Sequence, residues 1–296
     1  MNGILIIDKP EGFTSHDVVA RVRRILKTKR VGHTGTLDPF ATGVLVLLIG
    51  KATRLAQFLD KDEKEYDATL KFGYETDTGD RTGVRGAEFE VRSEDLESRV
   101  AGVLGKFRGR IQQTPPMYSA KKIDGKKLYE LARKGQVVER KAITVTIGKL
   151  EIVRGESTGP ADEITLNVAC SAGTYVRTLA ENIGRELGTG AHLQELRRTR
   201  AGKFTISQSV TIEALERMED PNAALLPIIE AVSHLPELRL PADRVDRTRS
   251  GLASLYDGDQ AEDGDAVRMM TPDGELAAIG IFNAAENTVQ PKVVLI

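Results

Sequence analysis

Apolar side chains recur along the chain with two spacings, which predict a mixture of strands and helices. Residues 64–72 alternate apolar and polar side chains, as in a strand with one buried face. Residues 15–27 place aliphatic side chains at helical spacing after Thr14 or Ser15, either of which suits the N-cap. A continuous apolar run at 44–49 predicts a buried strand. The predicted buried face of the 64–72 strand carries Tyr66, Ala68, Leu70 and Phe72.

Turn residues divide the rest of the chain into further elements and two domains. Gly73 to Gly86 is rich in Gly, Asp and Thr and predicts a loop. From Pro236 onward, short apolar runs are separated by Asp-Gly turns, which indicates a small β-rich domain. We therefore expect an α+β fold with domains at 1–235 and 236–296. Strands are expected at 3–7, 143–153 and 163–169, and helices at 52–59, 93–104, 128–134, 211–218 and 223–232, with one more ending near 187.

The composition is that of a globular protein with a sizeable core. The chain has 296 residues, of which 40% are hydrophobic and 29% charged. The single cysteine, Cys170, excludes an internal disulfide and fits a reducing compartment. The first residues lack the pattern of a signal peptide, and no apolar run approaches the roughly 20 residues of a membrane span. We expect a cytoplasmic protein that does not enter a membrane.

The charge distribution is more informative than the net charge of −1. Residues 21–30 contain six Lys or Arg and no acidic residue, and residues 106–141 contain eleven basic residues against three acidic ones. From Glu237 to the end, acidic residues outnumber basic ones by eleven to six. A basic body with an acidic end suits a protein that binds a polyanion on one face, although a single basic run is as easily a solvated surface.

The segment from Gly32 to Gly43, GHTGTLDPFATG, follows neither a helical nor a strand pattern. Apolar segments flank it on both sides, which predicts a loop held by the core, where functional residues tend to lie. Its ionisable side chains are His33 and Asp38. Two interpretations remain open from spacing alone. Asp38 is either a functional carboxylate or the N-cap of a helix that begins at Pro39.

The string GHTGTLDPFATG resembles the catalytic motif of the TruB-type tRNA pseudouridine synthases. The resemblance implies that Asp38 is catalytic and that His33 lies near the flipped base. DKPEGFTS at 8–15 is similar to the family's first motif, in which Lys9 and Pro10 support the catalytic loop. KEYDATLKF is similar to the second motif, so that Tyr66 is expected to act at the active site by stacking on the target base.

The segment SAGTYVR at 171–177 resembles the family's third motif, which implies that Tyr175 lies against the uracil and Arg177 pairs with Asp38. An arginine suits this position because a carboxylate in a closed pocket becomes protonated unless a cation holds it ionised. Without the motif, an exposed position on a helix is the default for Arg177. The resemblance also places Leu196 at the pocket wall, and we expect Lys64 to contact the substrate.

Residues 113–135 interleave lysines with Tyr118 and Tyr129, a composition that suits RNA loops. In the family this segment belongs to a mobile thumb, here about 106–141, and we expect Lys121, Lys122, Lys126 and Lys127 to contact the RNA backbone. The implied fold is a central mixed or antiparallel sheet flanked by helices, followed by a PUA-like domain.

The resemblance covers residues 3–206 and implies isomerisation of uridine to pseudouridine at position 55 in the T loop of tRNA. We expect no cofactor, no metal and no protein partner, and a monomer that binds the T stem-loop. Three alternatives remain: a glycosidase-like hydrolase with Asp8 as a second acid, a non-catalytic RNA-binding module, and the guide-dependent rRNA branch of the superfamily. The thumb-like insertion favours the stand-alone tRNA enzyme over the guide-dependent branch.

Overall fold

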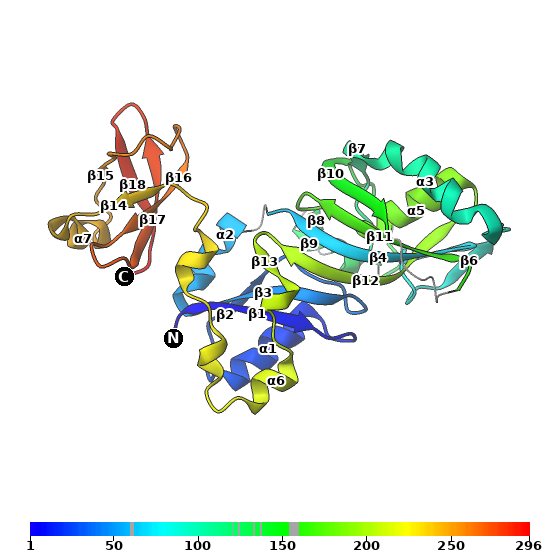
Figure 1. The fold of residues 1–296 in the computed structure, drawn as a ribbon, viewed down its shortest axis with the longest axis horizontal. Helices are drawn as coiled ribbons and strands as arrows, with labels where there is room; N and C mark the ends of the chain where they lie inside the picture. The colour runs from blue at the N-terminus through cyan, green and yellow to red at the C-terminus, as the bar shows by residue number, and fades with distance from the viewer. Residues whose placement is uncertain (60–61, 120, 124, 133, 137, 154–159) are drawn as a thin grey trace.

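The structure is a computed structural model that describes residues 1–59, 62–119, 121–123, 125–132, 134–136, 138–153 and 160–296. Within these residues, a nine-stranded mixed sheet has the main order β1-β3-β12-β4-β11-β10-β7 (Figure 1). Neighbours along this path are antiparallel, except that β12 and β3 run parallel. The strands are β1 (Gly3–Lys9), β3 (Thr42–Ile49), β12 (Ala191–Ala201), β4 (Lys64–Phe72), β11 (Glu163–Cys170), β10 (Ile143–Ile152) and β7 (Gly109–Gln113), with β2 (Val31–Thr34) paired to β3 and β13 (Phe204–Thr205) to β12.

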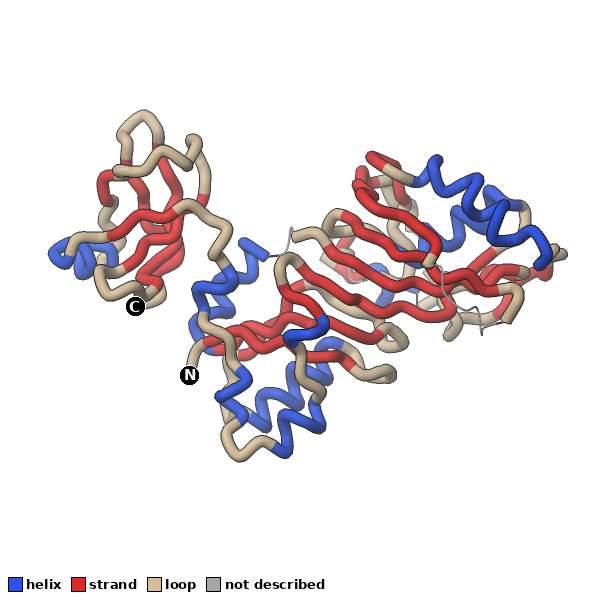
Figure 2. Tube along the Cα trace, viewed as in Figure 1, coloured by secondary structure: helices blue, strands red, loops and turns tan. Residues whose placement is uncertain are grey.

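Strands β1 and β3 are buried on both faces, which explains their continuous apolar runs. The helices that cover them are α1 (Ser15–Ile25), α6 (Ile212–Arg217), the 3₁₀ helix η1 (Gly50–Leu55) and α2 (Ala56–Leu59). On one face, Leu5 and Leu47 share a buried cluster with α1 and α6, which lie together below this part of the sheet (Figures 1 and 2). On the other face, Ile4 and Leu48 share a cluster with η1 and α2.

The other half of the sheet carries the second large core. Strand β4 alternates buried and half-buried residues along its whole length, as predicted. Its buried face packs against α5 (Val176–Leu187) and α3 (Leu96–Leu104), which follows the 3₁₀ turn η2 (Ser93–Asp95). Helix α5 ends as predicted at Gly188, whose φ of 69° lies in the left-handed region that favours glycine. None of the helices among the described residues is long and apolar enough to cross a membrane.

Two sequence predictions were wrong. Instead of a plain loop, residues 73–86 form most of a hairpin of β5 (Tyr74–Thr76) and β6 (Arg85–Glu88). Instead of one helix, residues 223–232 contain parts of two 3₁₀ turns, η5 (Pro221–Ala224) and η6 (Ile228–Ala231). Pro227 explains the second error, because a proline in the interior of a helix removes a hydrogen bond and clashes with the preceding turn.

The predicted insertion connects β7 to β10. Strand β7 follows the 3₁₀ turn η3 (Gly105–Phe107) and belongs to the main sheet, so the part outside the sheet begins after Gln113. Its described elements are the short strands β8 (Lys122–Ile123) and β9 (Lys126–Lys127), which pair antiparallel, and the helix α4 (Leu128–Ala132).

Residues beyond Pro236 form a separate five-stranded sheet in the order β14-β16-β17-β18-β15. The turn at Asp273-Gly274 joins β16 to β17, as the sequence predicted, and Gly274 has a φ of 87°. A helix that the sequence did not predict, α7, lies beside this sheet. The elements are β14 (Glu237–Arg239), α7 (Ala242–Arg249), β15 (Ser254–Leu255), β16 (Ala266–Met270), β17 (Leu276–Asn283) and β18 (Thr288–Val294).

The two sheets meet through apolar contacts. Met270, Ile279 and Leu295 belong to the same buried cluster as Leu55 and Leu59 of the large sheet's flanking helices. The second sheet therefore covers apolar surface that the first would otherwise expose.

Candidate active site

Asp38 lies on the loop between β2 and β3, and neighbouring elements fasten this loop. The Ser15 hydroxyl at the start of α1 accepts from the Leu37 N–H at 3.0 Å and donates to the Leu37 carbonyl at 3.2 Å. Lys9 is fully buried and donates to the Pro39 carbonyl at 3.2 Å. Burial lowers the pKa of Lys9 to about 8, against the raising effect of the Asp38 charge. Both neighbours of Asp38 in the chain are thus fixed, which restricts the carboxylate itself.

Arg198 on β12 fastens both ends of the same loop. Its guanidinium donates to the Gly35 carbonyl at 2.8 Å and to the Val44 carbonyl at 2.6 Å, and the residue is 1% exposed. Gly43 allows the close approach, because a Cβ there would lie 2.2 Å from the Arg198 carbonyl oxygen. The parallel contact of β12 with β3 therefore restricts the geometry of the loop that carries Asp38.

The carboxylate of Asp38 meets a buried arginine. Arg177 Nε lies 3.0 Å from Asp38 Oδ2, and Arg177 Nη1 lies 3.4 Å from Asp80 Oδ2. The remaining guanidinium hydrogens reach the carbonyls of Thr78 at 2.8 Å and Tyr118 at 2.7 Å. Arg177 is thus oriented on three sides, and the pairing with Asp38 expected from the third motif is present. Its burial contradicts the default of an exposed position on α5.

No helix begins at Asp38 in the described structure. The Asp38 carbonyl accepts from the Ala41 N–H at 3.1 Å, which closes a turn ahead of β3. The N-cap interpretation is therefore wrong. The side chain is instead directed toward Arg177, whose Nε lies 3.0 Å from Oδ2.

The surroundings of Asp38 oppose its ionisation, and Arg177 favours it. Burial raises the pKa of the Asp38 carboxyl above its ordinary value, and the nearby Asp80 charge raises it further, whereas the Arg177 charge and hydrogen bond lower it. The side chain remains 36% exposed, while that of Arg177 is 7% exposed. The cation is therefore the more buried of the two partners, and the Asp38 side chain is partly exposed to solvent.

Apolar and aromatic side chains surround this carboxylate. Tyr66 and Leu196 belong to the same buried cluster as Leu37, the neighbour of Asp38. Tyr175 is half-buried at the start of α5. Burial raises the pKa of both tyrosine hydroxyls, and the Asp38 charge raises it further in each case. The structure thus brings together residues from β2–β3, β4, β12 and α5, as expected from the sequence.

His33 and Lys64 lie at the edges of this site. His33 is half-buried on β2, and its ring meets that of His16 edge to face, with centroids 5.4 Å apart. Burial, followed by the charges of His16 and Arg198, lowers the pKa of His33 to about 4. Lys64 is buried and donates to the Asp62 carbonyl at 2.5 Å, and its Cε would lie 3.5 Å from a Cβ at Gly35, in the loop that carries Asp38.

Three neighbouring residues escaped prediction from the sequence. Asp80 lies in a Gly-, Asp- and Thr-rich segment that is typical of turns, and its role depends on contact with a distant helix. Arg198 is one of several arginines in 197–200, and nothing in the spacing singles it out for burial. His16 lies on the exposed side of a helix. The repeated acidic and hydroxyl residues around Asp80 were the only available signal.

The four lysines expected to contact the RNA backbone lie at the start of the insertion and on its short hairpin. Lys121 is partly buried, and its carbonyl accepts from the Leu128 N–H at 2.9 Å. The backbones of Lys122, Lys126 and Lys127 lie on the hairpin of β8 and β9, but their side chains lie outside the described part of the structure.

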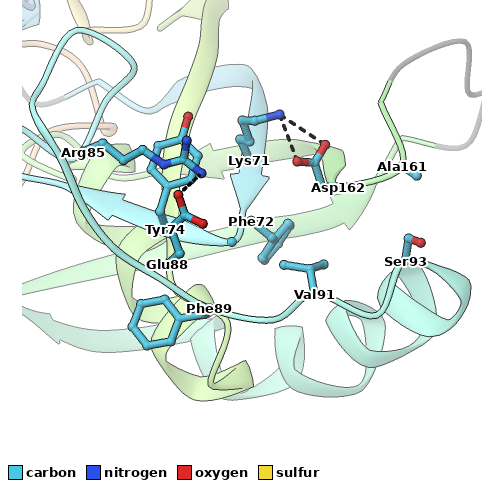
Figure 3. Close-up of a pocket in the computed structure, with 11 residues that line it drawn as sticks. Lys71, Phe72, Tyr74, Arg85, Glu88, Phe89, Val91, Ser93, Ala161 and Asp162 are labelled. Atoms are coloured by element: carbon cyan, nitrogen blue, oxygen red, sulfur yellow. Dashed lines mark hydrogen bonds and ion pairs between the residues drawn. The ribbon is translucent and has the colours of Figure 1, made fainter.

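A surface cavity of about 430 Å³ lies away from these residues, at the far end of β4 (Figure 3). The Arg85 guanidinium lies 3.9 Å from the centroid of the Tyr74 ring at its rim, and Lys71 pairs with Asp162 at 3.0 Å. Phe72 lines it six residues along β4 from Tyr66, roughly 20 Å away at the rise of a strand. The charges at its rim are neutralised by one another, and the cavity contains no residue of the Asp38 site.

Comparisons with known proteins identify the relatives of this chain. Residues 23–176 match the TruB family pseudouridylate synthase (N terminal domain), and residues 177–235 match the tRNA pseudouridylate synthase B C-terminal domain. tRNA pseudouridine synthase B of Syntrophotalea carbinolica is 45% identical over 283 residues, which cover 94% of this chain and 91% of that protein. That of Burkholderia mallei is 42% identical over 298 residues, covering 99% and 96%.

Solved structures show the same fold. A chain of a Cbf5-Nop10-Gar1 complex superposes with a TM-score of 0.76 at 30% identity, covering 99% of this chain and 84% of that chain. A chain of an H/ACA RNP bound to a substrate RNA containing 2′-deoxyuridine superposes with a TM-score of 0.75 at 28% identity, covering 99% and 85%.

The fold and the matched domains together define a pseudouridine synthase, an isomerase that converts uridine to pseudouridine in RNA. The curated relatives are more specific, because they are named for tRNA and align over almost the whole chain. The chain belongs to the TruB family of tRNA pseudouridine synthases.

Proposed function

We propose that this enzyme isomerises the uridine at position 55 in the T loop of tRNA, with Asp38 as the catalytic carboxylate. The observation that supports the assignment is the ion pair of Asp38 with the buried Arg177, at 3.0 Å, beside Tyr66. A fixed, partly exposed carboxylate that is paired with a buried cation is suited to attack carbon or to accept a proton.

The reaction requires no change of oxidation state. The bond from ribose C1′ to uracil N1 breaks, the base turns, and a new bond forms from C1′ to C5. The hydrogen on C5 leaves as a proton and N1 gains one, so substrate and product have the same composition. Three steps are open to Asp38, namely attack at C1′, attack at C6, and removal of a ribose proton.

The aromatic side chains support recognition of a base outside its stack. A base within the folded T loop must be extruded before a protein group can reach its glycosidic bond. Tyr66 and Tyr175 would contact the extruded uracil, Leu196 would form the apolar wall, and His33 would lie at the edge with Lys64. The lowered pKa of His33 keeps its ring neutral near pH 7, which suits stacking.

The insertion would hold the tRNA backbone. Residues 106–141 carry a large excess of positive charge, and neutralising phosphates with Lys or Arg is the usual source of affinity for nucleic acid. We infer that the enzyme acts as a monomer, without a protein partner, in the cytoplasm, where the buried thiol of Cys170 stays reduced.

A guide-dependent activity is the second candidate, because the solved relatives include chains of H/ACA assemblies. The higher identity to stand-alone tRNA enzymes favours the first candidate. A glycosidase-like hydrolase would need a second free carboxylate. Asp8, the second acid considered from the sequence, is engaged by both terminal nitrogens of Arg197, at 2.7 and 3.1 Å.

The test is incubation of the purified enzyme with an unmodified tRNA transcript, without guide RNA or other protein. Pseudouridine is then mapped by chemical modification and primer extension. A single stop at position 55 is expected, and a transcript with cytidine at 55 should give none. Modification elsewhere, or only after addition of a guide RNA, would contradict the proposal.

A further inference from the structure

Gln113, the last residue of β7, turns its side chain into the protein. The residue is 1% exposed, and its amide contacts the backbone of Tyr175 at two points. Oε1 accepts from the Tyr175 N–H at 3.0 Å, and Nε2 donates to the Tyr175 carbonyl at 3.3 Å. Since the backbone offers one donor and one acceptor, only one orientation of the amide satisfies both contacts.

Tyr175 depends on this amide because regular structure does not hold it fully. It is the N-cap of α5, with an extended backbone at φ −101° and ψ 103°, and no side chain caps the helix there. Its carbonyl accepts from the Leu179 N–H at 3.1 Å. Its own N–H has no acceptor within the helix, because the N–H groups at the start of a helix lack an intrahelical partner. Gln113 thus gives Tyr175 the pair of contacts that a neighbouring strand would supply.

A second contact joins the same two segments. Five residues after Gln113, the carbonyl of Tyr118 accepts from Nη2 of Arg177 at 2.7 Å. Arg177 lies two residues after Tyr175 and pairs with Asp38 through Nε. The first residues of the insertion are therefore connected to the start of α5 twice. Gln113 contacts Tyr175, and the Tyr118 carbonyl contacts Arg177, the partner of Asp38.

We propose that Gln113 is a positioning residue for the isomerisation, which acts through the backbone of Tyr175 to hold its ring against the reacting base. The inference rests on the proposed roles of Tyr175 and Asp38. Forming the bond to C5 requires the turned base to face C1′ within narrow limits, and a displacement of about 1 Å costs roughly a hundredfold in rate. Loss of the amide should therefore slow the chemical step more than it weakens tRNA binding.

The chain supplies a matched control in the preceding residue. Gln112 occupies the same strand, but its side chain is exposed and donates to the Thr144 hydroxyl at 2.8 Å. Met has nearly the length of Gln and no hydrogen-bonding amide. Gln113→Met and Gln112→Met therefore make the same chemical change at a buried and at an exposed position.

The experiment measures single-turnover pseudouridine formation at saturating enzyme, together with tRNA affinity and thermal unfolding. Gln113→Met is expected to lower the rate constant about tenfold to a hundredfold, with affinity within threefold of wild type. Gln112→Met should leave both within twofold. A folded Gln113→Met variant with a rate within twofold of wild type would overturn the proposal. If that variant does not fold, the shorter amide of Gln113→Asn is tested by the same criteria.

A double-variant cycle separates positioning from a general structural effect. In a Tyr175→Ala background, adding Gln113→Met should change the rate by less than threefold, because the ring that it positions is absent. An undiminished second loss would also overturn the proposal. The wild type and Asp38→Asn are measured alongside as a test of the proposed function. An inactive wild type or an active Asp38→Asn enzyme would contradict the proposed function itself, independently of Gln113.

Discussion

Arg177 Nε lies 3.0 Å from Asp38 Oδ2, in an ion pair between a buried cation and a partly exposed carboxylate. The cation is almost fully buried, whereas about a third of the aspartate side chain is exposed. This asymmetry suits the proposed roles, in which the arginine stabilises the charge and the aspartate meets the substrate. It also makes separate predictions for the two partners.

Asp38→Asn should abolish catalysis and spare binding. Asn has nearly the shape of Asp but neither attacks carbon nor accepts a proton as a carboxylate does. Turnover is expected to fall by about four orders of magnitude, with tRNA affinity close to wild type, since the group acts in the transition state. Pseudouridine yield and filter binding on the same variant provide the measurement. A near-normal yield would remove Asp38 from the mechanism.

Arg177→Ala should lower both turnover and stability, because it leaves Asp38 beside Asp80 without a cation.

Asp80→Asn should lower turnover although it leaves Asp38 itself in the chain. Oδ2 of Asp80 faces Arg177 Nη1 at 3.4 Å, and an amide nitrogen there would place a donor against a donor. The rotated arginine would then misplace Asp38, which predicts a loss of roughly tenfold to a hundredfold. Asp77 lies in the same segment but is exposed and caps the Val84 N–H, so Asp77→Asn is the control. Equal rates for the two variants would contradict the role of Asp80.

The sequence predicted those elements and site residues that can be recognised from a local pattern or motif in the chain. The alternation of 64–72 defined β4, and the motif strings named Asp38, Arg177 and Tyr66. It did not predict Asp80, because its significance depends on a contact with α5, about a hundred residues away. Similarly, Pro227 interrupts an apolar run whose spacing alone predicts a helix, and the energetic cost of that proline decides the outcome.

Replacing Lys121, Lys122, Lys126 and Lys127 with Ala should weaken tRNA binding and flatten its dependence on salt. Removing one lysine that neutralises a phosphate reduces the slope of log affinity against log salt by about 0.7 to 0.9. Affinity measured between low and moderate salt gives this slope directly. Lys149→Ala is the control, since Lys149 is exposed on β10 and pairs with Glu151 at 3.5 Å. An unchanged slope in the quadruple variant would exclude the hairpin from the interface.

His33 should make the fold less stable in mild acid. Its pKa falls from 6.5 in the unfolded chain to about 4 in the folded protein, so the unfolded state binds more protons between these values. The stabilisation is complete above pH 6.5 and is lost as the pH falls through 4. His33→Gln should therefore lose less unfolding free energy than wild type between pH 7 and 5, by about 1 kcal/mol for a partly exposed ring. Urea midpoints at both pH values test this, with the exposed His234→Gln as the control.

The C-terminal sheet should stabilise the catalytic part through the apolar cluster that they share. Met270, Ile279 and Leu295 share a buried cluster with Leu55 and Leu59, and the Arg54 guanidinium donates to the Val294 carbonyl. A chain ending at Leu235 exposes this surface, but it retains Asp38, Arg177 and every strand of the large sheet. We expect it to fold with a lower unfolding temperature and to form pseudouridine with reduced tRNA affinity.

Met270→Ala in the full chain separates the two contributions of the C-terminal sheet. Truncating a buried methionine costs roughly 2 to 5 kcal/mol, so this variant should lower the unfolding temperature in the same direction as the deletion. It should leave tRNA affinity unchanged at a temperature where it is folded, because Met270 is 2% exposed and cannot touch RNA. Thermal unfolding, affinity and single-turnover rate are measured for both proteins. If the shortened chain melts cooperatively yet forms no pseudouridine at saturating tRNA, the sheet is required for the chemistry, and its expected role in stability and binding alone is wrong.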